Sequence, residues 1–90
     1  MLVLPADLTY PHAPTCCRML SQALRAEGDT AVVADAAGLT RFDSSALAVL
    51  LECRREALAN GKTFSVRRLP VRLRELAVLY GVAELLPAAS

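Results

Sequence analysis

Tryptophan is absent from this chain of 90 residues, and histidine, cysteine and aromatic residues are scarce, with one His, three Cys, two Phe and two Tyr. A lone imidazole and the lack of a Cys-x-x-Cys spacing leave no ordinary set of zinc ligands. His12 has no partner for nucleophilic or metal chemistry, so we expect no catalytic residue, no metal and no cofactor. Cys16, Cys17 and Cys53 form no disulfide framework and are interpreted as small apolar side chains in a reducing compartment. A cysteine nucleophile is the alternative, which no thiol-activating motif supports.

Long apolar runs and a charge of one sign are also absent. The longest unbroken apolar run, Ala46–Leu51, is far shorter than the roughly 20 residues that span a bilayer, so we expect no direct membrane insertion. Ten basic and nine acidic side chains give a net charge of +1, which argues against a nucleic-acid partner. Met1–Leu4 lack the basic segment that starts a signal peptide. These absences predict a cytoplasmic protein of one domain, residues 1–90, with a single core.

What the chain does have is an alternation of strand-like and helix-like apolar spacing. Strands are predicted over residues 1–9, 30–39 and 62–69, and helices over residues 15–27, 43–59 and 70–80. Pro5 has no amide to donate to a ladder, which places the first strand at a sheet edge or a bulge. We therefore predict a small α/β sandwich in β-α-β-α-β-α order, in which a mainly parallel or mixed sheet of three to four strands packs with three to four helices.

The segment 43–59 carries the clearest helical pattern, and Asn60 and Gly61 follow it as a stop signal. Burying a large aliphatic side chain stabilises a fold by about 1.5 to 3 kcal/mol, so the apolar positions of the helices and strands are expected to form the core and not a site. The predicted core positions are Leu47, Leu50, Leu51, Leu58, Val66 and Leu76.

A cluster of basic residues stands out near the end of the chain, where "RRLPVRLR" brings together Arg67, Arg68, Arg72 and Arg74. The cluster is interpreted as a solvated flank of strand and helix. The alternative is a contact to phosphate or to an acidic partner.

The segment "LTRFDSSALAVLL" (Leu39–Leu51) places an acid and two hydroxyls before an apolar helix. One interpretation is structural, because Asp43 is a good N-cap that satisfies orphan amides of the first turn. The other is functional, because a helix start readily receives a phosphate or a polar group of a partner. The strand before Asp43 ends near Ala37, so these residues are expected at the carboxyl edge of the sheet, where open α/β folds hold ligands and partners.

The residues from about Asp29 to Pro87 resemble a known family. A strand, a Leu-x-x-x-Asp-Ser loop and the helix "SSALAVLLECRREALANGK", followed by "TFSVRRLP" and "LRELAVLYGVAELLP", are similar to the STAS domain family of bacterial anti-sigma-factor antagonists. The tail "LAVLYGVAELLP" is more similar to the MlaB subgroup, the small cytoplasmic subunits of the Mla phospholipid ABC transporter. One departure is Ala46, which stands where the family commonly has Gly.

The resemblance implies a non-enzymatic binding protein. In MlaB-like members the hydroxyl loop and the helix start are expected to contact the ATPase subunit of the lipid transporter at the inner-membrane face. In antagonist members Ser44 matches the hydroxyl that a partner serine kinase phosphorylates, and its phosphate would change partner binding through charge and bulk. The implied partner-binding residues are Arg41, Asp43, Ser44 and Ser45.

Overall fold

The protein is described by a computed structural model that covers residues 1–26 and 28–89. Its elements follow one another as β1 (Leu2–Val3), β2 (Asp7–Leu8), a 3-10 turn (Tyr10–His12), α1 (Ala13–Ala26), β3 (Ala31–Asp35), β4 (Arg41–Phe42), α2 (Ser45–Ala59), β5 (Thr63–Arg67), α3 (Val71–Leu79) and a second 3-10 turn (Ala83–Leu85). The predicted α/β class is confirmed.

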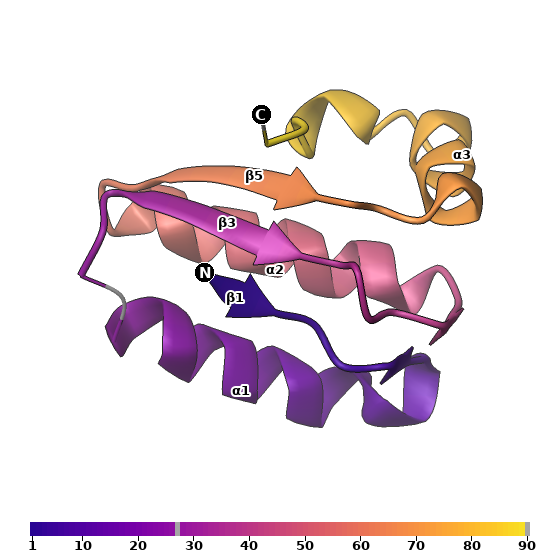
Figure 1. The fold of residues 1–90 in the computed structure, drawn as a ribbon, viewed down its shortest axis with the longest axis horizontal. Coiled ribbons are helices and arrows are strands. Elements are labelled where there is room, and N and C mark those ends of the chain that lie inside the picture. The colour runs from indigo at the N-terminus through magenta and orange to yellow at the C-terminus, as the bar shows by residue number, and fades with distance from the viewer. Residues whose placement is uncertain (27, 90) are drawn as a thin grey trace.

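Two parallel sheets form the strand layer. The larger has the order β1-β3-β5, and the smaller pairs β2 with β4. Helices α1 and α2 pack side by side under one face of the larger sheet, while α3 lies beyond the end of β5 (Figure 1). In β3 and β5 the alternate residues Val32, Ala34, Phe64 and Val66 are buried, and the residues between them are half-buried or exposed. The strands therefore alternate, because in the described part of the chain helices α1 and α2 cover only one face.

Pro5 divides the first predicted strand into β1 and β2. The expected edge position is confirmed, because β1 is the outer strand of the larger sheet. Beyond Pro5, the Ala6 carbonyl accepts hydrogen bonds from the amides of Thr40 (2.8 Å) and Arg41 (2.9 Å). These bonds hold β2 beside β4, a two-residue strand that the sequence pattern did not predict.

The helices agree with the prediction apart from their ends. α1 begins at Ala13, two positions before the predicted start, because Pro14 is tolerated within a first turn. Its predicted last residue, Glu27, lies outside the described residues. α2 ends at Ala59, as predicted, with Asn60 as its C-cap. Gly61 follows with a φ of 71°, in the left-handed region that favours glycine.

Most of the predicted core is confirmed. Leu47, Leu50 and Val66 are buried, and Leu51 and Leu76 are half-buried against the core. The prediction that Leu58 belongs to the core was wrong, since 48% of this residue is exposed. The buried stripe of α2 narrows in its last turns to Cys53 and Ala57, and Leu58 lies one residue around the helix from that stripe.

The tail after α3 returns to the sheet. The Val66 amide donates to the Pro87 carbonyl (2.8 Å), and the Ala89 amide donates to the Val66 carbonyl (2.9 Å). Leu86, which is only 1% exposed, is thereby fixed in the core. The tail thus protects the outer edge of β5, opposite β1.

Candidate functional site

The start of α2 lies at the carboxyl edge of the sheet, as predicted from the position of Asp43. The carboxylate of Asp43 accepts two hydrogen bonds there. Its Oδ1 accepts from the Ser45 amide (2.8 Å), and its Oδ2 accepts from the Tyr10 amide (3.0 Å) at the turn that leads into α1. One side chain therefore joins the starts of both helices. The capping interpretation of Asp43 is confirmed, although Ser44 occupies the position next to the helix.

These two bonds also determine the charge state of Asp43. The backbone hydrogen bond from Tyr10, followed by that from Ser45, lowers the pKa of the Asp43 carboxyl below its ordinary value of 3.8. Hydrogen bonds to an ionised group favour the ionised form. Asp43 is consequently a fixed negative charge at neutral pH, and its acceptor oxygens are directed at the protein's own backbone.

Ser44 differs from its neighbours in being exposed. Its side chain makes no capping hydrogen bond, whereas Ser45 is half-buried and donates its amide to Asp43. Ala46, where the family commonly has Gly, is fully buried and faces the core, so its methyl group does not meet a partner at this surface. The hydroxyl that the helix start presents to other molecules is therefore that of Ser44.

Arg41 lies on β4 beside β2, opposite Asp7 in the strand register. Its Nε is 3.9 Å from Asp7 Oδ2, and Nε2 of His12 lies at the same distance from that oxygen. Asp7 Oδ1 accepts from the Thr9 hydroxyl (2.7 Å), a bond that lowers the pKa of the Asp7 carboxyl. Arg41 and His12 are exposed, and Asp7 is half-buried. Asp43, Ser44 and Ser45 therefore form the start of α2, and Arg41 lies two residues before Asp43 on β4, with its side chain near Asp7.

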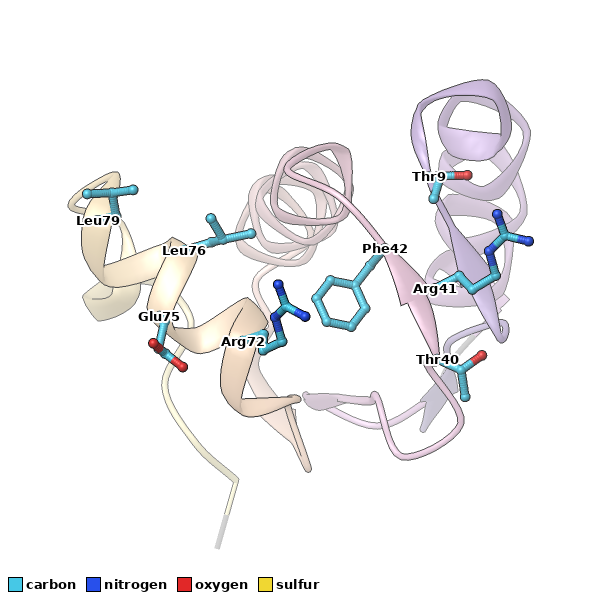
Figure 2. A pocket seen from close by; sticks show the side chains of 8 residues that line it. All are labelled: Thr9, Thr40, Arg41, Phe42, Arg72, Glu75, Leu76 and Leu79. Carbon is cyan, nitrogen blue, oxygen red and sulfur yellow. The ribbon is translucent and has the colours of Figure 1, made fainter.

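Next to Arg41 a groove of about 850 Å³ runs between β4 and α3 (Figure 2). Phe42 is half-buried in it, and Figure 2 shows the side chains of Phe42 and Arg72 pointing toward one another. The sequence interpretation missed this groove. No local sequence pattern marks the groove, because the groove forms only where α3 lies opposite β4. The lining residues are Thr9, Thr40, Arg41, Phe42, Arg72, Glu75, Leu76 and Leu79.

Large apolar side chains are exposed around the same edge. Tyr10, the residue whose amide bonds Asp43, is 77% exposed, and Leu79, at the groove, is 75% exposed. Exposed apolar groups that gather beside a polar centre are typical of protein interaction sites. The other exposed apolar side chains on α3 and just after it are Val71, Val78 and Tyr80.

The cysteines lie elsewhere, between α1 and α2, and are free thiols. Burial raises the pKa of Cys53 to about 12, and burial likewise raises the pKa of Cys16 and Cys17. A raised pKa suppresses the thiolate, which is the nucleophilic form, so the cysteine-nucleophile alternative gains no support. Residues 1–26 and 28–89 contain no group of three His, Cys, Asp or Glu placed to hold a metal. Within those ranges no helix has the length and apolarity needed to cross a bilayer.

Comparison with known proteins bears on this edge of the molecule. A family model described as "Mlab, STAS domain" matches residues 1–87. The match includes the whole of the Arg41–Ser45 segment and all of α3. A comparison with curated proteins gave no match.

Proposed function

The chain belongs to the MlaB-like STAS domain family, and from that premise we propose that it is a regulatory subunit of an Mla-type phospholipid ABC transporter. STAS domains are generally non-enzymatic interaction domains with regulatory roles. In this proposal the protein is cytoplasmic, sits at the inner-membrane face through its complex, and binds and stabilises or activates the transporter's ATPase subunit. The transporter in turn maintains the lipid asymmetry of the envelope.

The observation that supports the proposal is the exposed Ser44 hydroxyl at a helix start that Asp43 holds in place. Because Asp43 joins the starts of α1 and α2, the surface is already ordered before a partner arrives, and little conformational entropy remains to be lost on binding. Tyr10, which bonds Asp43, and Leu79, at the groove lined by Arg41, supply exposed apolar area. A polar centre with apolar surroundings is the composition of a protein interface.

The test is co-purification from native cells followed by reconstitution. A tagged copy of the protein should bring down the transporter ATPase, and adding the purified protein to the purified ATPase should raise its rate of ATP hydrolysis or its melting temperature. If the ATPase does not co-purify and its rate and melting temperature stay the same, the proposal is wrong.

The exposure of Ser44 also favours a second candidate, an anti-sigma-factor antagonist that phosphorylation of Ser44 switches. A phosphate there would lie at the positive end of α2 but beside the ionised Asp43, so it would add charge and bulk to the docking surface. In that case Ser44→Asp abolishes binding to a serine kinase partner. An unchanged affinity of the Ser44→Asp variant for such a kinase excludes this candidate.

A further inference from the structure

The basic stretch from Arg67 to Arg74, at the end of β5 and the start of α3, is not part of the site at Ser44. Arg67 is half-buried, and the other three arginines, Arg68, Arg72 and Arg74, are exposed. Within the described residues none of the four takes part in an ion pair. These four guanidinium groups, within eight positions of the chain, therefore have no carboxylate of the described residues at ion-pair distance.

Arg72 brings this charge into the groove between β4 and α3. Figure 2 shows its guanidinium beside the Phe42 ring, whereas the carboxylate of Glu75 points away from that ring. Arg41 lines the groove from β4, and its ion pair with Asp7 is long, at 3.9 Å. Leu76 and Leu79 complete the lining from α3. Figure 2 shows the Arg41 guanidinium on the other side of β4, pointing away from the Phe42 ring. The groove thus combines an apolar floor with one guanidinium, that of Arg72, beside it.

We propose that this groove binds an acidic amphipathic segment of the partner protein, with an apolar side chain against Phe42 and Leu76 and a carboxylate at Arg72. The inference deepens the proposed function, on which it rests, by giving the chemistry of the segment through which the ATPase docks. Arginine suits this role because its planar group pairs with carboxylates through two parallel hydrogen bonds.

The shape of the surface favours a chain segment over a bilayer. Phe42 is half-buried between β4 and α3, whereas Leu79 at the same groove is 75% exposed, so a planar lipid surface meets Leu79 before it meets the Phe42 ring. A single protruding side chain reaches that floor. Charge complementarity then selects an acidic segment, because the charged group beside the Phe42 ring is the Arg72 guanidinium, while the carboxylate of Glu75 points away from that ring.

The direct test uses a synthetic peptide of Leu and Glu with amphipathic helical spacing, and a matched peptide in which Lys replaces Glu. Binding is followed by fluorescence anisotropy, and amide NMR shifts show where each peptide binds. The Glu peptide should bind and shift the amides of Phe42 and Leu76, and the Lys peptide should not bind. The variants Arg72→Glu and Leu79→Asp should each weaken the Glu peptide at least about tenfold, and rising salt should weaken it further. Arg18→Glu, an exposed change of the same charge on α1, should not.

Both variants change exposed side chains, and circular dichroism checks that they remain folded. Equal binding of the two peptides, or an Arg72→Glu variant that binds the Glu peptide as the wild type does, overturns the proposal. The proposal is also overturned if the protein binds phosphatidylglycerol vesicles through Arg72 and does not bind the Glu peptide, because the groove then faces lipid.

The purified transporter ATPase separates this inference from the proposed function. If the ATPase binds the wild type and the Arg72→Glu variant equally, the groove proposal is wrong and the proposed function stands. If the ATPase does not bind the wild type while the Glu peptide occupies the groove, the groove proposal stands and the proposed function is wrong.

Discussion

Asp43 and Ser44 are neighbours in the sequence with different surroundings in the structure. Both oxygens of Asp43 accept backbone hydrogen bonds, one from each of the two helix starts that it joins. Ser44 is exposed and makes no capping bond. At the scale of single residues, helix capping is therefore the role of Asp43, and the reception of a phosphate or a partner's polar group depends on Ser44.

Replacing Asp43 should make the melting temperature of the protein depend less on pH in the acid range. Its pKa lies below the ordinary 3.8 in the folded protein, so its stabilising effect is complete above about pH 4 and disappears as the pH falls through the folded value. We expect Asp43→Asn to melt a few degrees below the wild type at pH 7 and at nearly the same temperature at pH 2. Thermal melts across this range test it, with Asp29→Asn, an exposed loop carboxylate, as control. A difference in melting temperature that is constant with pH contradicts the role given to Asp43.

The three thiols should react in an order that follows their burial. Cys17 is half-buried, Cys16 is buried, and Cys53 is 1% exposed with a pKa raised to about 12. Because Cys53 reacts only after the helices open, we expect its labelling to be at least about a thousandfold slower in the native protein than in denaturant. Mass spectrometry of native protein treated with a thiol reagent at pH 8 measures this. Native Cys53 reacting as fast as Cys17 would revive the cysteine-nucleophile alternative.

The turn between β5 and α3 forces a non-glycine residue into an unusual conformation. Arg68 has a φ of 57°, in the left-handed region, at a bend between Arg67 and Leu69. This conformation costs an ordinary residue roughly 1 to 2 kcal/mol, and β-branched residues tolerate it least. The connection that leads from β5 to α3 therefore contains a strained residue.

Substitutions at Arg68 should follow that strain. Arg68→Gly should leave the free energy of unfolding unchanged or raise it by up to about 1 kcal/mol, and Arg68→Val should lower it by about 1 to 2 kcal/mol. Urea unfolding of the three proteins gives the comparison. If the Val variant is as stable as the Gly variant, the left-handed turn does not exist in solution.

The tail contributes to the core through Leu86. Leu86→Ala should cost about 2 to 5 kcal/mol, because it leaves a cavity beneath β5. Leu85→Ala is a matched control one position away, at a side chain that is 37% exposed, and should cost much less. Chemical denaturation of both variants tests the placement of the tail, and equal losses would contradict it.

Local sequence signals sufficed for the long elements. The apolar stripe of α2 and its Asn60–Gly61 stop predict that helix to within two residues at its start. Strand β4 and the tail pairing were not predictable in this way, because a two-residue strand exists only through partners far along the chain, such as the Ala6 carbonyl. The candidate site divides similarly. A local Asp-Ser motif marks the start of α2, but the groove beside Phe42 requires α3 to lie opposite β4, which no local pattern encodes.

At the scale of the whole molecule, the residues of the candidate site lie at one edge of the parallel sheet. The strands β3 and β5 end there, α2 begins there, and the loop to α3 starts there (Figure 1). Tyr10, which bonds Asp43, the start of α2 at Ser44, and the groove lined by Phe42 and Arg72 therefore all lie toward this edge. The amino-terminal edge of the sheet, where α2 ends at Ala59, lies at the opposite end of that helix.

The dissociation constant of the proposed complex with the transporter ATPase tests this account most directly. Ser44→Trp places a bulky side chain at the exposed start of α2, and Ala59→Trp places the same side chain at the exposed end of the same helix. We predict that Ser44→Trp weakens binding at least about tenfold, or about 1.4 kcal/mol, while Ala59→Trp binds as the wild type does. A folded Ser44→Trp variant that binds the ATPase with unchanged affinity would contradict the claim that partners dock at the start of α2.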